Sequence, residues 1–244
     1  MDDIFKIDNF LNNKELHIIL SVFEKYFKKQ GFVFLDSYYQ INNPLLFSEI
    51  HDFLYKKIKN LIGNFYQYSE IQKLGKISHN CDFILKQYKI FMPHTDHVPT
   101  IPGFYHYRDL IFPLLVDKKK ETFYYICNQI YEGKACHLQF GAKSNNDYKP
   151  IYAQIFNKKP YEDYGIKNIN YKNQVSKNWI DEFIGSDIPS DFFKGLSIKK
   201  MFKWEPGSLI IQSPVYIHGP TNYHLRGADW KIGMTIRVFK KNEL

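Results

Sequence analysis

Arginine, cysteine and long apolar runs are scarce in this sequence. Of the 33 basic residues, three are Arg (Arg108, Arg226 and Arg237), although the formal net charge is +8. Arg is the side chain that most often binds bases and phosphates in a bidentate way. The positive charge is therefore better explained by lysines on solvated faces than by a nucleic-acid-binding surface, so nucleic acid is not expected as a partner.

The three cysteines, Cys81, Cys127 and Cys136, lack the spacing of a metal knuckle or of a disulfide framework. We expect core thiols in a reducing compartment. The N-terminus begins acidic, without the basic and apolar regions of a signal or transit peptide. No apolar run approaches the roughly 20 residues of a membrane span. These absences predict a cytoplasmic protein with no membrane partner.

Apolar and aromatic side chains are abundant: 44% of the 244 residues are hydrophobic, including 21 Phe and 19 Tyr. A chain of this length buries a full-sized core without disulfide or metal support. Ordinary numbers of Gly (13) and Pro (11) exclude collagen-like repetition and low complexity. No internal repeat or linker divides the chain, so one domain over residues 1–244 is predicted.

The first third of the chain is expected to be helical. Asn12 and Glu15 have the spacing of a capping box, and the helix that follows should end near Gly31. A second helix is predicted from Asn43, with Pro44 in its first turn. Apolar residues fall on one face of each helix: Leu16, Ile19, Leu20, Phe23 and Phe27 in the first, and Leu46, Ile50, Phe53, Leu54, Leu61 and Ile62 in the second.

From about residue 80 the sequence changes to short runs rich in aromatic and β-branched residues, which are typical of strands. Turn signals at 118–120 and 132–134 indicate hairpins and therefore antiparallel pairing. Residues 143–196 are weakly periodic and indicate an insertion over one end of the sheet, with short helices near 178–184 and 190–196. The expected strands are 81–88, 89–96, 108–116, 122–130, 137–142, 199–204, 208–219 and 230–239.

These patterns divide the single domain into three parts. Residues 1–79 are a helical support, 80–142 and 197–240 form the β core, and 143–196 are an insertion or lid. Helices followed by many antiparallel strands predict a mainly β protein with a jelly-roll or barrel core.

His94 and Asp96 stand two residues apart, so on an extended strand both side chains point to the same face. That face is apolar upstream, at Tyr88, Ile90 and Met92, which indicates an interior-facing strand end. A distal histidine, His218, follows the apolar run 209–217 and precedes a Gly-Pro pair, so it also lies where a strand stops. Two histidines and one carboxylate make the facial triad of non-haem iron(II), which leaves three coordination positions open.

The last strand alternates cleanly. Ile232, Met234, Ile236 and Val238 cover one face, and Lys231, Gly233, Thr235 and Arg237 cover the other. A cationic face that points inward beside a metal site predicts a site for an anion.

With these residues the sequence resembles the iron(II)/2-oxoglutarate-dependent dioxygenases, whose motif is His-x-Asp, a long gap, a distal His and a basic residue on the last core strand. The early segment 6–20 and the approach to the distal His, 202–222, are also similar to this superfamily, so the resemblance extends over most of the chain. It implies a double-stranded β-helix, the cupin-like jelly roll.

The resemblance implies roles for particular residues. His94, Asp96 and His218 would bind iron(II), and Lys231 would bind the far carboxylate of 2-oxoglutarate. Arg237 shares the face of Lys231 and could assist, and the remaining assignments are weaker: Tyr88 and Thr235 for neutral hydrogen bonds to 2-oxoglutarate, Arg226 for a substrate carboxylate, and Trp230 for lining the pocket.

The implied reaction is hydroxylation of a small-molecule or carrier-bound substrate by dioxygen, with 2-oxoglutarate converted to succinate and CO2. Asp96 is retained, which argues against the halogenating branch, where a small residue replaces the carboxylate. The insertion 143–196 and the loop 97–107 are expected to select the substrate.

Other readings stay open at this point. His97, His106, His137 and His224 are rival metal ligands. The same superfamily contains oxidative demethylases of nucleic acids, which would use the basic surface. A cupin-like metal-binding protein would keep the triad but not need Lys231, and a non-enzymatic binding module would hold no metal.

Overall fold

The computed structural model describes residues 4–29, 38–67, 70–71, 82–87, 93–96, 101–131, 167–168, 170, 172, 175–188, 190–193 and 195–242. Several predictions fall outside these residues and are not tested by the structure. They are Cys81, Tyr88, His97, Cys136, the turn at 132–134, the strand at 137–142, and most of the insertion 143–196.

The larger of two sheets is antiparallel throughout and carries the longest strands. Its centre is formed by β5 (Phe104–Val116) and β10 (Lys231–Lys241), which pair along most of their length. The full order is β1 (Phe5–Ile7), β8 (Leu209–Gln212), β5, β10, β4 (Phe83–Gln87) and β2 (Tyr38–Asn42), with β3 (Tyr66–Gln67) also paired to β10.

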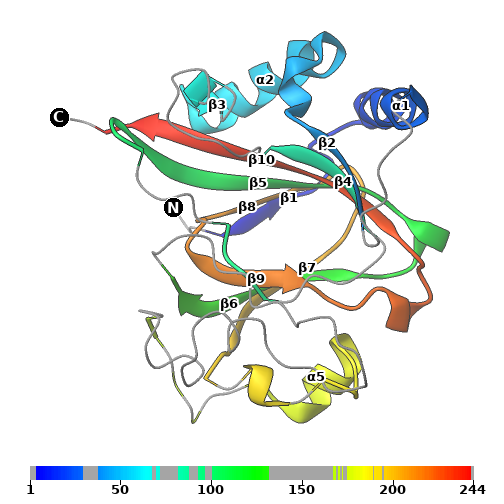
Figure 1. The fold of residues 1–244 in the computed structure, drawn as a ribbon, viewed down its shortest axis with the longest axis vertical. Helices are drawn as coiled ribbons and strands as arrows, with labels where there is room; N and C mark the ends of the chain where they lie inside the picture. The colour runs from blue at the N-terminus through cyan, green and yellow to red at the C-terminus, as the bar shows by residue number, and fades with distance from the viewer. Residues whose placement is uncertain are drawn as a thin grey trace.

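The smaller sheet lies below the larger one in Figure 1. Its order is β7 (Ile198–Lys203), β6 (Phe123–Ile130) and β9 (Tyr216–Pro220), again antiparallel. Segment 93–96 extends this sheet beyond β9, because His94 and His218 exchange both backbone hydrogen bonds, each 2.8 Å long. The segment therefore acts as a further short strand at the edge of the small sheet.

From β5 onward the chain crosses repeatedly between the two sheets, as in a jelly roll. The chain passes from β5 to β6, from β8 to β9, and from β9 to β10 by crossing from one sheet to the other. The predicted double-stranded β-helix core, mainly β with helices outside it, is confirmed.

Two local predictions about the strands were wrong. Residues 118–120 do not form a hairpin turn, because β5 is already paired on both edges, to β8 and β10, and has no free edge for β6. The run 208–219 is two strands in different sheets. Pro214 stands between them and has no backbone N–H for a ladder, so the chain turns there.

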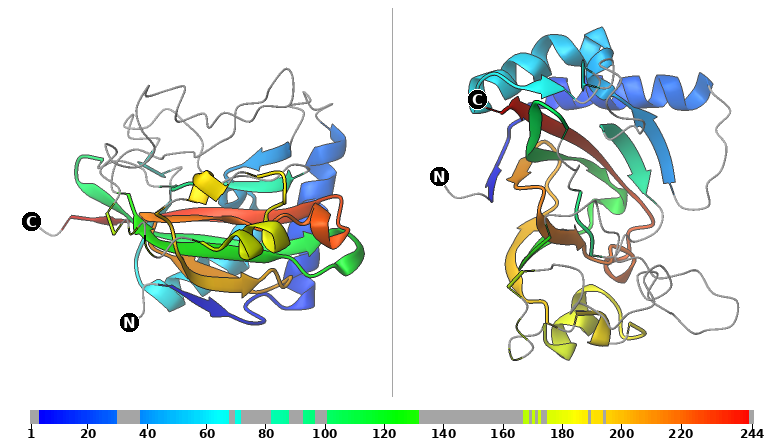
Figure 2. Two further views of the ribbon diagram at one scale, coloured as in Figure 1. Left: turned by 90° about the horizontal axis from the view of Figure 1, so that it is seen from below. Right: turned by 60° about the vertical axis from the view of Figure 1, so that its left-hand side comes forward.

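Helices α1 (Asn13–Lys29) and α2 (Ser48–Ile62) cover the outer face of the large sheet (Figures 1 and 2). The predicted capping box is present: the Asn12 side chain accepts from Glu15 N at 3.0 Å, and the Glu15 carboxylate accepts from Asn12 N at 2.9 Å. The second helix begins later than predicted, since 44–46 form a separate 3-10 turn after Asn43, whose φ is 51°.

A short helix, α5 (Lys177–Phe183), covers the outer face of the small sheet. It agrees with the helix predicted near 178–184, whereas the one predicted at 190–196 is a 3-10 turn over Ser190–Phe193. Gly195 follows with φ of 80°, a left-handed conformation that ends a helix.

The apolar core has layers on both sides of each sheet. Ile232, Met234, Ile236 and Val238 pack against the helices. A second cluster fills the space between the sheets, and a third, which includes the buried thiol of Cys127, lies between the small sheet and α5. The alternation of β10 therefore turns Lys231, Gly233, Thr235 and Arg237 toward the space between the sheets.

None of the helices in the described part of the chain is both long and apolar enough to cross a membrane.

The capping box gives a prediction about stability. Asn12→Ala removes the side-chain acceptor at the start of α1 and should lower the free energy of unfolding by about 1 kcal/mol, measured by urea denaturation. Asn13→Ala, one residue later and without a role in the box, is the matched control and should change the stability by less than about 0.5 kcal/mol. Equal losses in the two variants would contradict the capping role.

Candidate metal centre

Two histidines and one aspartate come together where segment 93–96 lies along β9. One ligand atom each from His94, Asp96 and His218 lies within 4.8 Å of the other two. The Oδ2 of Asp96 is 3.5 Å from the Nε2 of His218, and the two imidazole centroids are 4.5 Å apart. His94 and Asp96 share a face because they are alternate residues of an extended segment, and the backbone pairing places His218 opposite His94.

The buried ring of His218 is held in one orientation. Its Nδ1 lies 2.8 Å from the carbonyl oxygen of Tyr216, so Nδ1 carries the proton and donates, and Nε2 is left bare on the side of Asp96. The side-chain amide of Gln212 is 2.9 Å from the same Nδ1. The buried Oε1 of Gln212 has no hydrogen-bond partner among the described residues. If the amide is flipped, so that Oε1 and Nε2 exchange places, Oε1 accepts a hydrogen bond from Nδ1 of His218. A bare Nε2 is what a metal ligand requires.

Asp96 is held by a cation from the opposite sheet. The Nη2 of Arg237 donates to Oδ1 of Asp96 at 2.7 Å, which leaves Oδ2 facing His218. Burial alone would raise the pKa of Asp96. The charge of Arg237, followed by the neighbouring imidazoles of His218 and His94, outweighs burial and holds that pKa well below its usual range. The carboxylate is therefore ionised at neutral pH and can act as a ligand.

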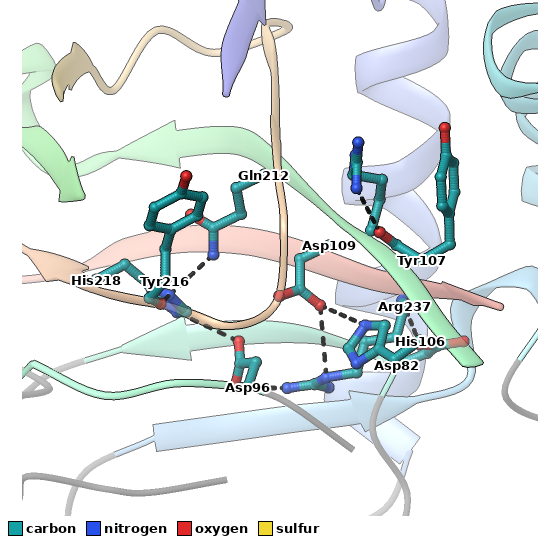
Figure 3. A network of polar contacts seen from close by, with 10 residues as sticks. Asp82, Asp96, His106, Tyr107, Asp109, Gln212, Tyr216, His218 and Arg237 are labelled. Carbon is teal, nitrogen blue, oxygen red and sulfur yellow. Dashed lines mark hydrogen bonds and ion pairs between the residues drawn. The ribbon is translucent and has the colours of Figure 1, made fainter. Parts of the chain in front are cut away.

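The partners of these ligands form a row across the large sheet (Figure 3). Gln212 on β8 is the cross-strand neighbour of Asp109 on β5, and Asp109 is the cross-strand neighbour of Arg237 on β10. All three are buried. One end of the row touches His218 and the other touches Asp96, so the large sheet orients donors carried by the small sheet.

Lys231 lies elsewhere between the sheets, at the start of β10. Lys231 is 2% exposed, and its Nζ is 3.9 Å from the ring centroid of Trp204 and 5.9 Å from that of Tyr223. Burial lowers the pKa of Lys231 to about 7. Among the described residues, no carboxylate or hydrogen-bond acceptor is within bonding distance of this amine.

The surroundings of Lys231 contain further donors without acceptors. The buried Trp204 Nε1 and Tyr223 hydroxyl have no hydrogen-bond partner in the described part of the chain. Both belong to the cluster between the sheets, and so does Tyr124, whose ring is 5.5 Å from that of His218. Burial, then the charges of Asp96 and Asp109, raise the pKa of Tyr124, which stays a neutral phenol. A buried cation beside unpaired donors is a site prepared for an anion.

The other predicted site residues have different surroundings. Thr235 lies between Gly233 and Arg237 on the inward face of β10, and Tyr88 is outside the described residues. Arg226 pairs with Glu182 of α5 at 3.2 Å on the surface. Trp230 packs into the cluster on the helical side of the large sheet, with the Nζ of Lys86 4.1 Å from its ring centroid. The structure thus places Arg226 and Trp230 apart from the triad.

The rival histidines are placed as follows. His97 and His137 lie outside the described residues, and His224 is exposed in a 3-10 turn beside Tyr223. His106 is buried, with its Nε2 2.9 Å from Asp109. Within the described ranges, the set of His94, Asp96 and His218 is the one cluster of three possible metal ligands.

Sequence reasoning missed Gln212 and Asp109, and it considered His106 only as a rival metal ligand. Gln212 and Asp109 are polar residues next to apolar runs, LII and LIFPLLV. A polar side chain inside a strand that is buried on both faces needs a buried hydrogen-bond partner. The polar residues beside these apolar runs could therefore have indicated a buried polar network.

The fold is thus an antiparallel jelly roll with a His, Asp, His set that could hold a metal ion. Elsewhere between the sheets lies a buried cation, Lys231, without a counter-ion among the described residues.

Comparisons with known proteins add little to this description. No family model matches the chain, and no curated protein matches it either. A solved structure with a similar course of the chain is HygX from Streptomyces hygroscopicus, crystallised with nickel and 2-oxoglutarate bound. The two chains are 10% identical, the match covers 98% of this chain and 83% of HygX, and the TM-score is 0.43. At this similarity a function cannot be transferred, so the function has to follow from this chain's own residues.

Removal of one donor tests the metal centre. Asp96→Ala should lower the affinity for iron(II) by at least about 100-fold, because loss of a ligand costs more than the 10- to 100-fold loss typical of residues behind the ligands. The affinity can be measured by anaerobic equilibrium dialysis, and the fold checked by circular dichroism. Asp52→Ala, on α2 with a side chain 82% exposed, is the control and should bind as the wild type does. Iron binding at wild-type affinity by a folded Asp96→Ala protein would refute the assignment.

Proposed function

We propose that the protein is an iron(II)- and 2-oxoglutarate-dependent dioxygenase that hydroxylates a small-molecule or carrier-bound substrate. The observation that carries this proposal is the buried Lys231, which has no counter-ion among the described residues, inside a jelly roll that also presents the His, Asp, His set. The triad supports a metal, and Lys231 with its unpaired neighbours supports an anionic co-substrate.

The donor set fits iron(II). His94, Asp96 and His218 would hold the ion from one side, and their partners Arg237, Gln212 and the Tyr216 carbonyl fix the donors beforehand. When bound, iron(II) supplies open coordination positions for a chelating 2-oxo acid and for dioxygen, together with the redox chemistry of oxidation.

The chain's own residues would bind the far carboxylate of 2-oxoglutarate. Lys231 would neutralise its charge, and Trp204 Nε1 and the Tyr223 hydroxyl would donate hydrogen bonds to it. These atoms are buried among aromatic rings, where a charged hydrogen bond is stronger than in water. The Thr235 hydroxyl, on the same inward face of β10, is a further candidate donor.

Gly233 makes room for this arrangement. A Cβ at Gly233 would lie 2.8 Å from the indole of Trp204, closer than real contacts allow. The absence of a side chain at this position lets the indole lie directly on β10, beside the ammonium group of Lys231. The pocket wall therefore depends on Gly233 as well as on the polar residues.

Lys231 also distinguishes this proposal from a cupin-like metal-binding protein that does not use 2-oxoglutarate. A buried lysine without a partner is expensive, and proteins rarely keep one unless a ligand or reaction uses it. A metal site alone gives Lys231 no role, whereas a dicarboxylate gives it a counter-ion. Oxidative demethylation of nucleic acid has no comparable observation in its favour among the described residues.

Succinate formation tests the reaction class. With iron(II), 2-oxoglutarate, ascorbate and air, the protein should form succinate slowly even without its hydroxylation substrate. One oxygen atom of dioxygen enters succinate, and ascorbate supplies the two electrons that reduce the other to water. Lys231→Met should raise the KM for 2-oxoglutarate by about 10- to 100-fold, since a charge-assisted hydrogen bond contributes about 1.5–3 kcal/mol. NMR spectroscopy follows succinate directly. Lys203→Met, at a surface lysine paired with Glu121, is the control. No succinate, or an unchanged KM in Lys231→Met, would overturn the proposal.

The affinity for 2-oxoglutarate should depend on pH through Lys231. Burial lowers its pKa to about 7 in the free protein, so below pH 7 the amine is protonated and binds the dianion directly. Above pH 7 the neutral amine must first take up a proton, so Kd should rise by up to about tenfold per pH unit. Calorimetry with nickel in place of iron measures Kd without turnover. Lys231→Met should bind weakly with no such slope, and a flat wild-type Kd between about pH 7 and 9 would contradict the role.

A further inference from the structure

A buried His and Asp pair lies behind the metal centre and takes no part in the chemistry described so far. The Nε2 of His106 is 2.9 Å from Oδ1 of Asp109, and both side chains are fully buried. The ring of His106 stacks on Phe239, with centroids 4.9 Å apart and planes inclined by 24°. The pair is thus a fixed unit inside the protein, not a surface ion pair.

A β-bulge creates this pair. Residues three apart on a regular strand point to opposite faces, so His106 and Asp109 should not meet. The register of β5 against β10 shifts between Val238 and Phe239, because Val238 is opposite Arg108 and Phe239 is opposite His106. The extra residue in β5, Tyr107, reverses the alternation and brings His106 to the inner side with Asp109.

The pair connects to the metal centre through one guanidinium. The Nε of Arg237 is 3.8 Å from Oδ1 of Asp109, and its Nη2 donates to Oδ1 of Asp96 at 2.7 Å. Figure 3 shows the resulting chain of contacts from His106 through Asp109 and Arg237 to Asp96. Arg237 therefore stands between two carboxylates, the fully buried Asp109 and the partly buried Asp96, which is a proposed metal ligand.

We infer that His106 and Asp109 are positioning residues, which through Arg237 determine which oxygen of Asp96 faces the metal. This inference rests on the proposed metal centre. His106 holds Asp109, and Asp109 shares the charge of Arg237. The guanidinium then engages Oδ1 of Asp96 and leaves Oδ2 turned toward His218. Without the shared charge, Arg237 would pair with Asp96 alone and compete with the metal for its carboxylate.

The test uses Co(II) as the probe, without 2-oxoglutarate or turnover. Asp109→Asn should weaken the Co(II) affinity by about 10- to 100-fold, as residues behind metal ligands usually do, and should alter the visible ligand-field bands. His106→Leu should weaken it by about tenfold. His106→Gln keeps a side-chain N–H at a similar reach and should restore the affinity to within about threefold of the wild type. Leu110→Val, next to Asp109 but facing the helices, is the control for a change in packing.

The outcomes separate this inference from the proposed function. If wild-type protein binds no Co(II), or binds it equally well after His94→Ala, the metal centre itself is refuted. If the wild type binds through His94 but Asp109→Asn and His106→Leu keep the wild-type affinity and spectrum, the positioning role alone is refuted. Should Asp109→Asn not fold, the comparison of His106→Leu with His106→Gln decides: equal affinities would refute the role, and rescue by Gln would support it. Weaker binding in Leu110→Val to the same degree would likewise count against it.

Discussion

Strand β10 carries two cations into the space between the sheets, and one of them is paired while the other is not. Arg237 has Asp96 at 2.7 Å and Asp109 nearby, whereas Lys231 has aromatic rings around its amine and no carboxylate among the described residues. Buried charges are costly unless they are compensated. In the proposed function, Arg237 lies at the candidate metal centre, and the negative charge of 2-oxoglutarate would compensate Lys231.

The jelly roll makes this arrangement possible because it places two sheets face to face. The candidate metal ligands lie on the small sheet and its extension 93–96, and the side chains that contact them, Gln212 and Arg237, lie on the large sheet. A row of three cross-strand neighbours, Gln212, Asp109 and Arg237, reaches across the gap to His218 and Asp96. The site therefore depends on the distance between the two sheets, which the apolar cluster between them stabilises.

Patterns local in sequence predicted much of this structure. The capping box of Asn12 and Glu15 fixed the start of α1, and the alternation over 230–239 assigned the inward and outward faces of β10. The spacing of His94 and Asp96 predicted that both point to one side. These features depend on residues close in sequence, so periodicity and capping rules are sufficient to find them.

Features that depend on distant partners were not predictable in the same way. The segment 118–120 looks like a hairpin turn, and only the pairing of β5 with β8 and β10 shows why it crosses to the other sheet. Arg237 was expected to assist Lys231 at the co-substrate. Its contact with Asp96 was not predictable, because a sequence does not show which carboxylate lies opposite a given strand residue. The bulge at Tyr107 is hidden in the sequence as well, and without it residues 106 and 109 of a regular strand would point to opposite faces.

The central claim, that one site joins a metal at the triad to a dicarboxylate at Lys231, is tested most directly by an anaerobic titration of the protein with iron(II) and then 2-oxoglutarate, followed by visible absorption. The account predicts a charge-transfer band of the iron chelate that saturates with 2-oxoglutarate and needs a much higher concentration in Lys231→Ala. Iron-loaded protein that gives no band, or a band with the same concentration dependence in both proteins, would contradict it.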